Sequence, residues 1–345
     1  MARHRILSLP LAVPVPQKDT QTPPWTVMSV LRWTTGRFEE RRLGTPRLDA
    51  EVLIAAALGL PRLQLYVQFD RPLAAPELAK IREAVQRRQA GESVAYIVGK
   101  KEFFGLDFAV DARVLVPRPD TETLVDEALG RLRPRPPEPG DAAAVAEPAS
   151  ASSDGPPAPA PQPVSPPTST DAPPAPPPAW KIADVGTGSG AIIITLGKQL
   201  PGASLYAVDA SDDALAVARA NAAQHGAPVT FLQGDLGAPL APFAPFDLIA
   251  ANLPYIPVGD LAGLAPEVRA EPRLALDGGP DGLALVRRLV QQAPALLAAG
   301  GALVLEIGAG QAPATAELLR AAGFEDVRMR RDLGAIDRVV SGVKP

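Results

Sequence analysis

The carboxyl-terminal half of the chain alternates short apolar runs with amphipathic segments from Trp180 onward. Short apolar runs bounded by turn residues are typical of buried strands, and the longer segments between them have helical spacing. The predicted strands cover residues 180–185, 204–209, 229–232, 246–251 and 301–307, and the predicted helices cover 191–200, 212–225, 281–298 and 311–322. Such alternation predicts an α/β fold, with a mostly parallel sheet between layers of helices. The last two apolar runs, 325–330 and 336–342, follow each other directly and predict an antiparallel hairpin at one edge of the sheet.

The amino-terminal part has helical spacing instead. Residues 26–92 predict a small helical bundle, in which one helix contains Val30, Asp49 caps a second helix, and a third helix runs from Pro76 to about Gln89. A bundle of this size is marginal as a catalytic core, so we expect an accessory domain.

Residues 93–116 change character and carry two strand-like runs, 94–99 and 103–110. These runs predict a β-hairpin that links the bundle to the larger domain. The larger domain is expected over residues 117–345, beginning with an extended proline-containing segment and a helix that Asp120 or Thr121 caps.

Two segments have compositions that oppose folding. Residues 1–25 are basic, then apolar and broken by proline, and predict a disordered extension, with Met28 as an alternative start. In residues 134–179 more than a third of the positions are Pro, and there is no Leu and no aromatic residue. Such a segment cannot bury enough apolar surface to become ordered, so it predicts a disordered insert within the larger domain.

Composition excludes several kinds of chemistry. The 345 residues include no Cys, so disulfides, thiolate catalysis and cysteine-ligated zinc are impossible. The two histidines, His4 and His225, lie far apart in sequence, which argues against a histidine-based triad or metal site. The net charge of −4 opposes a broad nucleic-acid-binding surface. No apolar run approaches the roughly 20 residues that a membrane span needs, and we expect a soluble, cytoplasmic protein.

A glycine-rich turn follows the first predicted strand of the sheet. Gly186-Thr187-Gly188-Ser189-Gly190 allows a tight turn and a close approach of a ligand to the backbone. Asp209 ends the next strand, where its carboxylate could accept both hydroxyls of a ribose, and Asp235 follows the third strand, where it could meet an adenine amino group. A dinucleotide-binding fold shares this outline. Asp184, two residues before the first glycine, favours the alternative, because a dinucleotide-binding strand is usually apolar there. The three acids resemble the S-adenosylmethionine site of Rossmann-like methyltransferases.

The corner Asn252-Leu253-Pro254-Tyr255 follows the fourth predicted strand, at the edge of the sheet where ligands bind. It is also compatible with an ordinary strand exit. Beside a methyl donor, however, Asn-x-Pro-Tyr resembles the signature of methyltransferases that act on planar amide or amino nitrogens. The Asn252 side-chain oxygen and the Leu253 carbonyl would accept the two N–H bonds of such a nitrogen and orient it, and Tyr255 would wall the pocket.

Several further segments, in the same order, resemble the HemK/PrmC family of release factor glutamine N5-methyltransferases. They include Ala95-Tyr96-Ile97-Val98-Gly99, Glu102 to Leu106, Val116-Pro117-Arg118-Pro119-Asp120-Thr121-Glu122, Asp184 to Gly190, Asn252 to Tyr255, Leu276 to Leu283, Leu305-Glu306-Ile307-Gly308 with Gln311, and Asp332-Leu333-Gly334 with Asp337-Arg338. The resemblance covers residues from about 26 to 343, apart from the proline-rich insert.

The resemblance implies a Rossmann-like methyltransferase sheet with S-adenosyl-L-methionine as cofactor. It implies the glutamine of the Gly-Gly-Gln motif of peptide chain release factors as substrate, with the helical domain helping to hold the release factor. We expect Asn252, Leu253, Pro254 and Tyr255 to be catalytic. Cofactor binding is expected from Gly186, Thr187, Gly188, Ser189, Gly190, Asp209, Asp235, Leu236 and Asn252. We expect a monomer with no metal, no membrane contact and no direct contact with nucleic acid.

Two residues depart from the family pattern. Leu253 replaces the usual first proline of Asn-Pro-Pro-Tyr, and Leu236 stands where many members place an aromatic residue. Asn-Leu-Pro-Tyr also resembles ribosomal RNA adenine dimethylases, which leaves nucleic-acid adenine methylation as an alternative. A non-catalytic S-adenosylmethionine-binding interaction protein is a third alternative, which the intact Asn252, Pro254 and Tyr255 oppose.

Overall fold

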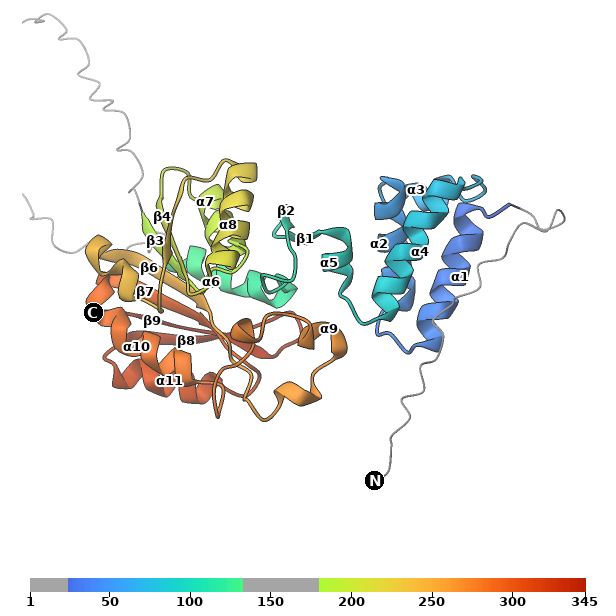
Figure 1. Ribbon diagram of the computed structural model, residues 1–345. Coiled ribbons are helices and arrows are strands. Elements are labelled where there is room, and N and C mark those ends of the chain that lie inside the picture. Colours follow the sequence, from blue (N-terminus) through green and yellow to red (C-terminus); the bar gives the residue numbers. More distant parts are fainter. Residues whose placement is uncertain (1–23, 133–179) are drawn as a thin grey trace, which may run out of the picture. The chain divides into compact units, whose positions relative to one another are not determined.

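The computed structural model describes residues 24–132 and 180–345 (Figure 1). Residues 1–23 of the expected extension and all of the expected insert at 134–179 lie outside these ranges. The chain divides into a first unit, Met1–Val98, and a second unit, Gly99–Pro345. Each unit has its own hydrophobic core, and each is described by itself below.

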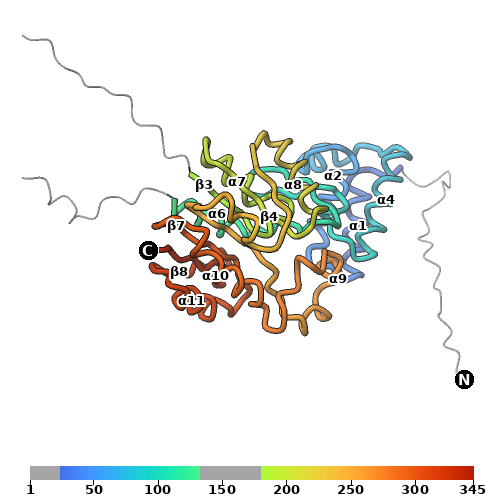
Figure 2. Tube along the Cα trace, turned by 60° about the vertical axis from the view of Figure 1, so that its left-hand side comes forward, coloured from blue at the N-terminus to red at the C-terminus, as the bar shows by residue number. Residues whose placement is uncertain are grey.

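The first unit is helical, as its spacing predicts. Its helices are α1 (Val27–Glu40), α2 (Pro46–Leu58), α3 (Gln64–Val67), α4 (Ala75–Gln89) and α5 (Val94–Val98). Figure 2 shows α1, α2 and α4 as neighbouring coils, coloured blue to cyan. Their apolar faces share one core, which includes Leu31, Phe38, Leu53 and Ile81. Burial of these faces holds together helices that are short for independent stability.

Asp49 was predicted to cap the second helix, and this prediction was wrong. The helix α2 begins earlier, at Pro46, because proline has the backbone angle of a first helical residue and lacks an N–H that would need a partner. Asp49 therefore lies inside the helix and is buried, where its Oδ2 accepts a hydrogen bond from Nε of Arg88 at 2.7 Å. Asp49 thus links α2 to α4 through its ion pair with Arg88, and it does not cap α2.

The strand predicted at 94–99 is also wrong, because residues 94–98 form the helix α5. The Ser93 hydroxyl accepts a hydrogen bond from the Tyr96 amide at 3.2 Å, and the Ile97 amide donates to the Ser93 carbonyl. A serine at this position favours a helix start, and a run this short has no periodicity to reveal it. A hairpin is present further along the chain, as β1 (Lys100–Phe103) and β2 (Leu106–Ala109) within the second unit, and its turn lies inside the run predicted as one strand at 103–110. It contacts α8, since the Asn221 side chain is hydrogen-bonded to the backbone of Ala109.

The second unit contains a seven-stranded sheet, in the order β5-β4-β3-β6-β7-β9-β8. Its strands are β3 (Lys181–Val185), β4 (Ser204–Asp209), β5 (Val229–Gln233), β6 (Phe246–Asn252), β7 (Leu297–Glu306), β8 (Glu325–Arg331) and β9 (Asp337–Val343). The first five are parallel, and β9 is antiparallel to both β7 and β8. The mostly parallel sheet and its antiparallel pair at one edge are as predicted.

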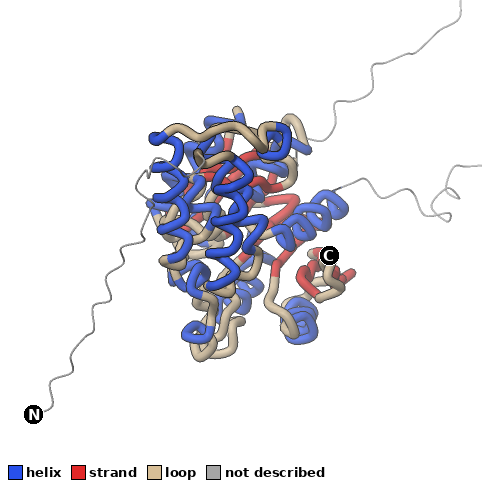
Figure 3. Tube along the Cα trace, turned by 90° about the vertical axis from the view of Figure 1, so that its right-hand side faces the viewer, coloured by secondary structure: helices blue, strands red, loops and turns tan. Residues whose placement is uncertain are grey.

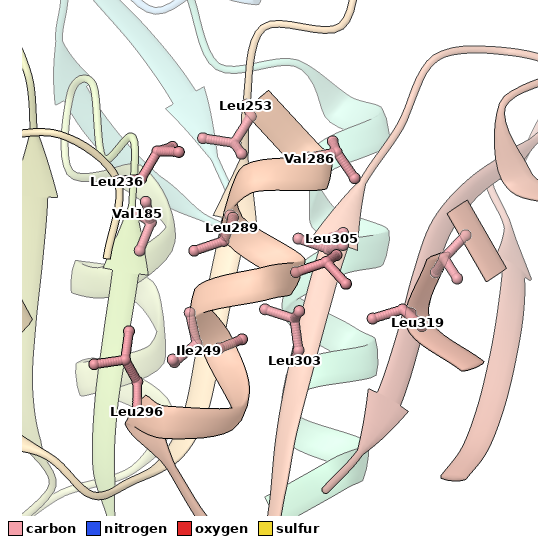
Figure 4. Close-up of a cluster of buried hydrophobic side chains, with 14 of the residues drawn as sticks. Val185, Leu236, Ile249, Leu253, Val286, Leu289, Leu296, Leu303, Leu305 and Leu319 are labelled. Atoms are coloured by element: carbon pink, nitrogen blue, oxygen red, sulfur yellow. The ribbon is translucent and has the colours of Figure 1, made fainter. Parts of the chain in front are cut away.

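Helices cover both faces of this sheet, whose strands are drawn in red in Figure 3. One face packs against α6 (Glu122–Leu132), α7 (Ala191–Gln199) and α8 (Asp212–His225), and the other packs against α10 (Ala284–Leu296) and α11 (Ala312–Ala321). Figure 4 shows Val286, Leu289 and Leu296 of α10 against Ile249 and Leu303 of the strands. The α10 helix ends where β7 begins, four residues before the predicted strand start at 301.

In the described parts of the chain, no helix is long and apolar enough to cross a membrane.

The connection from β6 to α10 is long and carries only short helical turns. They are η4 (Leu261–Gly263), α9 (Pro266–Arg269) and η5 (Arg273–Ala275). A long connection at the carboxyl end of a parallel strand is a usual place for binding residues. It leads directly from the Asn252 corner.

Candidate active site

The strands β3 and β6 are neighbours at the point where the sheet order reverses. The chain leaves β3 towards β4 and β5 on one side, and β6 and β7 lie on the other. Ligands of open α/β sheets bind in the crevice beyond the carboxyl ends of such strands. The pairing of Val185 with Ala251 brings the glycine-rich turn beside the Asn252 corner. A Cβ atom at Gly186 would lie 3.2 Å from a methyl carbon of Leu253, so these two loops touch.

The glycine-rich turn is held by backbone hydrogen bonds to β4. The Gly186 and Thr187 amides donate to the Val208 carbonyl at 2.8 and 3.0 Å. Gly188 has φ +54°, and a Cβ there would meet no atom within 4 Å, so the backbone borders open space. The Thr187 and Ser189 side chains are buried instead. A side chain larger than hydrogen at Gly188 would extend into the space that a ligand needs.

Asp209 at the end of β4 binds the two loops next to it. One carboxylate oxygen accepts the Gly188 amide at 2.9 Å, and the other accepts the Ser211 amide at 2.9 Å. Each oxygen has a further lone pair, so the carboxylate remains able to accept hydroxyl groups from a ligand. Its position is thereby fixed before any ligand binds.

Asp184 lies below the turn and does not face the open space. It is fully buried on β3, and its Oδ2 accepts a hydrogen bond from the Thr187 hydroxyl at 2.7 Å. Burial raises the pKa of Asp184 to about 7, with a further contribution from the nearby charge of Asp209. Asp184 thus stabilises the turn from inside the protein, whereas the sequence had grouped it with Asp209 and Asp235 as an acid of the cofactor site.

A cavity of about 200 Å³ opens above these loops. Its lining includes many of the residues predicted as site residues: Gly186, Gly188, Asp209, Asp235, Leu236, Asn252, Leu253 and Pro254. Four other predicted site residues do not line it: Thr187, Ser189, Gly190 and Tyr255. Gly190 instead allows helix packing, because a Cβ there would lie 2.9 Å from Ile194 and 3.3 Å from Ala218.

At the far end of the cavity, Asp235 and Leu236 follow β5. The Asp235 carboxylate forms an exposed ion pair with Arg288 of α10. Leu236 is buried against the core beneath the cavity (Figure 4). An acid above an apolar floor suits a flat ring that carries an amino group.

Asn252 is the last residue of β6 and is partly buried at the near end of the cavity. Its Nδ2 donates a hydrogen bond to the Thr121 hydroxyl at 3.3 Å. On β7, Glu306 is the strand partner of Asn252, and alternation places both side chains on the face that α6 covers. Burial raises the pKa of Glu306 to about 7, while hydrogen bonds from Thr121 and Asn252 and the charge of Arg338 favour its ionised form.

The backbone of Tyr255 is held in place by the side chain of Gln311. Its carbonyl accepts a hydrogen bond from the Gln311 side chain at 3.0 Å, and the Gly308 amide donates to Oε1 of the same glutamine at 2.8 Å. Burial, followed by the charge of Glu306, raises the pKa of Tyr255 to about 12. Tyr255 does not line this cavity, and its expected role as a wall beside the planar substrate group stays a prediction.

Sequence reasoning missed two groups of residues. Glu306 and Thr121 lie behind Asn252, and segments 113–115 and 272–275 complete the cavity wall. Glu306 and Thr121 were inside motifs that carried the family resemblance, but nothing in their spacing connected them to Asn252. In the sequence, each of these two residues was recognisable only as a charged or polar side chain near the end of a predicted strand or helix.

Comparison with known proteins agrees with this geometry. A model described as the PrmC N-terminal domain matches residues 29–99, and a methyltransferase domain model matches residues 182–270. The release factor glutamine methyltransferase of Geobacter sulfurreducens is 42% identical over 319 residues, which are 92% of this chain and 96% of that protein. The corresponding proteins of Chlorobaculum tepidum and Moorella thermoacetica are 39% and 40% identical, over 92% and 85% of this chain and 97% and 89% of those proteins.

These matches confirm the family that the motifs predicted, and with it the methyltransferase fold and S-adenosylmethionine as cofactor. The relatives align over nearly their whole lengths, so both units of the chain are included in the similarity. The chain belongs to the family of release factor glutamine methyltransferases.

Proposed function

We propose that this protein transfers a methyl group from S-adenosylmethionine to the side-chain amide nitrogen of the glutamine in the Gly-Gly-Gln motif of release factors. The observation that carries the proposal is the orientation of Asn252 at the edge of the cavity. Its NH2 group donates inward to Thr121, which leaves the side-chain oxygen to accept a hydrogen bond. The names of the relatives, release factor glutamine methyltransferases, supply the substrate class.

The residues of the cavity fit the cofactor. Asp209 is fixed by two backbone amides and retains lone pairs for ribose hydroxyls. Gly186 and Gly188 allow close approach of a ligand to the backbone at the centre of the cavity. Asp235 and Leu236 offer a carboxylate and an apolar floor to the adenine ring. When bound, the cofactor supplies a methyl group on a positively charged sulfonium.

The protein's part in the reaction is orientation. An amide nitrogen is a weak nucleophile because its lone pair is delocalised into the carbonyl group. The Asn252 oxygen and the Leu253 carbonyl accept its two N–H bonds and aim the nitrogen at the methyl carbon. The nitrogen forms a bond to the methyl carbon as the carbon–sulfur bond of the donor breaks, which leaves a neutral thioether, and the nitrogen releases one proton to solvent. Leu253 supplies a backbone carbonyl as proline would, so the replacement of the usual proline preserves the acceptor.

Pro254 and Tyr255 keep this acceptor pair in place. Proline restricts the preceding residue to an extended conformation, and the Tyr255 carbonyl is held by Gln311 at 3.0 Å. The helical first unit helps to hold the release factor. We place the enzyme in the cytoplasm, as a monomer that acts on protein and makes no direct contact with nucleic acid.

The test is transfer of labelled methyl groups from S-adenosylmethionine to three candidate substrates in separate reactions: a release factor, ribosomal RNA and DNA. We expect label in the release factor alone, and none in a release factor whose Gly-Gly-Gln glutamine is replaced by alanine. Label in the RNA or DNA, with an unlabelled release factor, would instead support the adenine methyltransferase alternative. Cofactor binding without transfer to any substrate would support a non-catalytic role.

A further inference from the structure

Glu306 is a buried carboxylate to which the proposed reaction assigns no role. It ends β7 directly beside Asn252 of β6, and only 2% of its surface is exposed. Thr121, at the end of the short helix η1 (Pro119–Thr121), is buried against the same face of the sheet. Three side chains from three separate segments thus meet behind the acceptor oxygen of the corner.

The hydrogen bonds among these groups have a direction. An ionised carboxylate can only accept hydrogen bonds, whereas a hydroxyl donates one and accepts others. Thr121 and Asn252 both lower the pKa of Glu306, as donors beside its carboxylate would, and its buried Oε2 has no other hydrogen-bond partner in the described part of the chain. The Asn252 Nδ2 also donates to the Thr121 hydroxyl oxygen, at 3.3 Å. With its NH2 turned inward, the Asn252 amide must present its oxygen to the cavity.

The opposite orientation of the amide would be unfavourable. A flipped Asn252 would place its oxygen towards a buried carboxylate and leave its NH2 group facing the substrate nitrogen, itself a donor. Two acceptors brought together inside the protein repel each other, and the low local dielectric strengthens that repulsion. A neutral, hydrogen-bond-donating neighbour in place of Glu306 would tolerate both orientations.

We propose that Glu306 is a positioning residue, which acts through Thr121 to hold the Asn252 amide with its oxygen towards the substrate nitrogen. This inference rests on the proposed function for the identity of that nitrogen. Glu306 touches neither substrate nor cofactor in this role. Its effect on the reaction is transmitted by the orientation of one amide group.

The charges around Glu306 make this control sensitive to pH. Arg338 on β9 favours the ionised form and is itself paired with Asp332 at 2.9 Å and Asp120 at 3.5 Å. Asp120 disfavours the ionised form, and the Tyr255 phenol also faces Glu306. Burial outweighs the favourable contacts and raises the pKa of Glu306 to about 7. Protonation of Glu306 would turn one of its acceptor oxygens into a hydrogen-bond donor, which would no longer favour the inward NH2 group of Asn252. The rate of methyl transfer should therefore fall as the pH is lowered through 7.

Variants of Thr121 and Glu306 test the proposal in the full-length protein. Thr121→Val keeps the shape and removes the hydroxyl, and Glu306→Gln keeps the shape and removes the charge. Each should lower kcat for release factor methylation by about 10- to 100-fold, as expected for residues that orient a reacting group, with the Kd for S-adenosylmethionine changed by less than about 2-fold. Thr121→Ser should recover most of the lost rate. Thr195→Val, which removes another buried hydroxyl on α7, is the matched control and should keep the wild-type rate.

Two further measurements separate positioning from loss of structure. Glu306→Gln should abolish the decline in kcat near pH 7, and it should have no additional effect in an Asn252→Ala background, because both changes act on one group. Unchanged kcat and an unchanged pH profile in both Glu306→Gln and Thr121→Val would overturn the proposal.

A spectroscopic measurement needs no release factor and therefore stays informative if the proposed substrate is wrong. In 15N-labelled protein, the side-chain NH2 signals of Asn252, identified by their loss in Asn252→Ala, should shift with pH around 7. The shift should disappear in Glu306→Gln and Thr121→Val. Signals that titrate identically in wild type and both variants would show that Glu306 does not act on this amide.

Discussion

At the scale of single residues, the site depends on side chains whose positions are fixed by hydrogen bonds from the protein itself. Asn252 is held by Thr121, and Asp209 is held by the amides of Gly188 and Ser211. Groups fixed in this way lose little conformational freedom when a ligand binds. A change to either side chain should therefore affect a specific step rather than the whole fold.

Asn252→Ala should reduce methyl transfer by about 10²–10³-fold, because it removes one oriented acceptor. The affinity for S-adenosylmethionine should be largely kept, since Asp209 and the glycine-rich turn are untouched. Single-turnover transfer to a release factor, together with calorimetric titration of the cofactor, measures the two effects separately. Transfer at the wild-type rate would show that the amide does not orient the nitrogen.

Asn252→Asp keeps the oxygen but replaces the NH2 group with a second oxygen beside Glu306. Two carboxylates on paired residues of neighbouring strands cannot both ionise easily, so we expect a rate close to that of Asn252→Ala at neutral pH. Substantial activity in Asn252→Asp would mean that acceptor geometry alone suffices and that the inward NH2 group is dispensable.

Asp209→Ala should weaken S-adenosylmethionine binding severely while the fold is kept. Each charge-assisted hydrogen bond lost to the ligand costs about 1.5–3 kcal/mol, and the turn also loses the acceptor of its Gly188 amide. Calorimetric titration measures the effect. Asp213→Ala, an exposed acid on α8, is the control and should bind normally. Equal affinity in Asp209→Ala and wild type would remove Asp209 from the cofactor site.

At the scale of elements, strand β3 with its turn contains a carboxyl group that opposes folding at high pH. The pKa of Asp184 is raised from 3.8 to about 7 by burial, so the folded state binds this proton more tightly than the unfolded state. Its contribution to stability is present below about pH 4 and is lost as the pH rises through 7. Glu306, with a pKa also raised to about 7, acts in the same direction.

Asp184→Asn should therefore change the pH dependence of stability. Asn keeps an oxygen for the Thr187 hydroxyl but cannot ionise, so the stability of this variant relative to wild type should increase from pH 5 to pH 8, by at most about 2–3 kcal/mol. Thermal or urea unfolding of both proteins at the two pH values measures the difference. A difference that stays constant, or decreases, over this interval would show that Asp184 is ionised throughout.

The segment before α10 packs against the Asn252 corner, and it has no room for a side chain at Gly282. Gly282 has φ +78°, and a Cβ there would overlap the Tyr255 carbonyl oxygen and the Gln311 amide nitrogen. Gly282→Ala should therefore displace the corner, lower the transfer rate and destabilise the protein by about 1–3 kcal/mol. Gly259→Ala is the matched control in the same connection, because a Cβ there meets no atom within 4 Å. Equal rates and melting temperatures in both variants would show that the corner does not depend on this contact.

At the scale of the whole molecule, three clusters of buried side chains carry the described fold, one in the first unit and two in the second. Deletion of residues 140–175 should leave the melting temperature and the transfer rate nearly unchanged. The segment has no Leu or aromatic residue to contribute to a core, and the free energy of loop closure depends only weakly on loop length. Thermal unfolding and a methylation assay measure both quantities. A melting temperature lower by many degrees would show that the segment packs on a unit.

The sequence by itself determined the sheet, the glycine-rich turn and the corner. Strands that are buried on both faces must be apolar along their length, and the carboxyl ends of parallel strands meet at one edge, so the residues just beyond them could be placed without a structure. Asp209 and Asn252 were identified for this reason. The five apolar residues 94–98 were misassigned because a run this short is compatible with a strand or a helix, and the Ser93 cap decided between them.

Only the tertiary structure decided which polar side chains face the cavity and which lie behind it. Thr187 belongs to the predicted turn and Asp184 to the strand before it, yet their side chains are hydrogen-bonded to each other inside the protein. Glu306 and Thr121 reach Asn252 through strand register and helix packing, between segments that are remote in sequence. The spacing of residues along one segment carries no information about such contacts. The direction of each side chain depends on the neighbouring segments against which it packs, and those are set only when the whole sheet has formed.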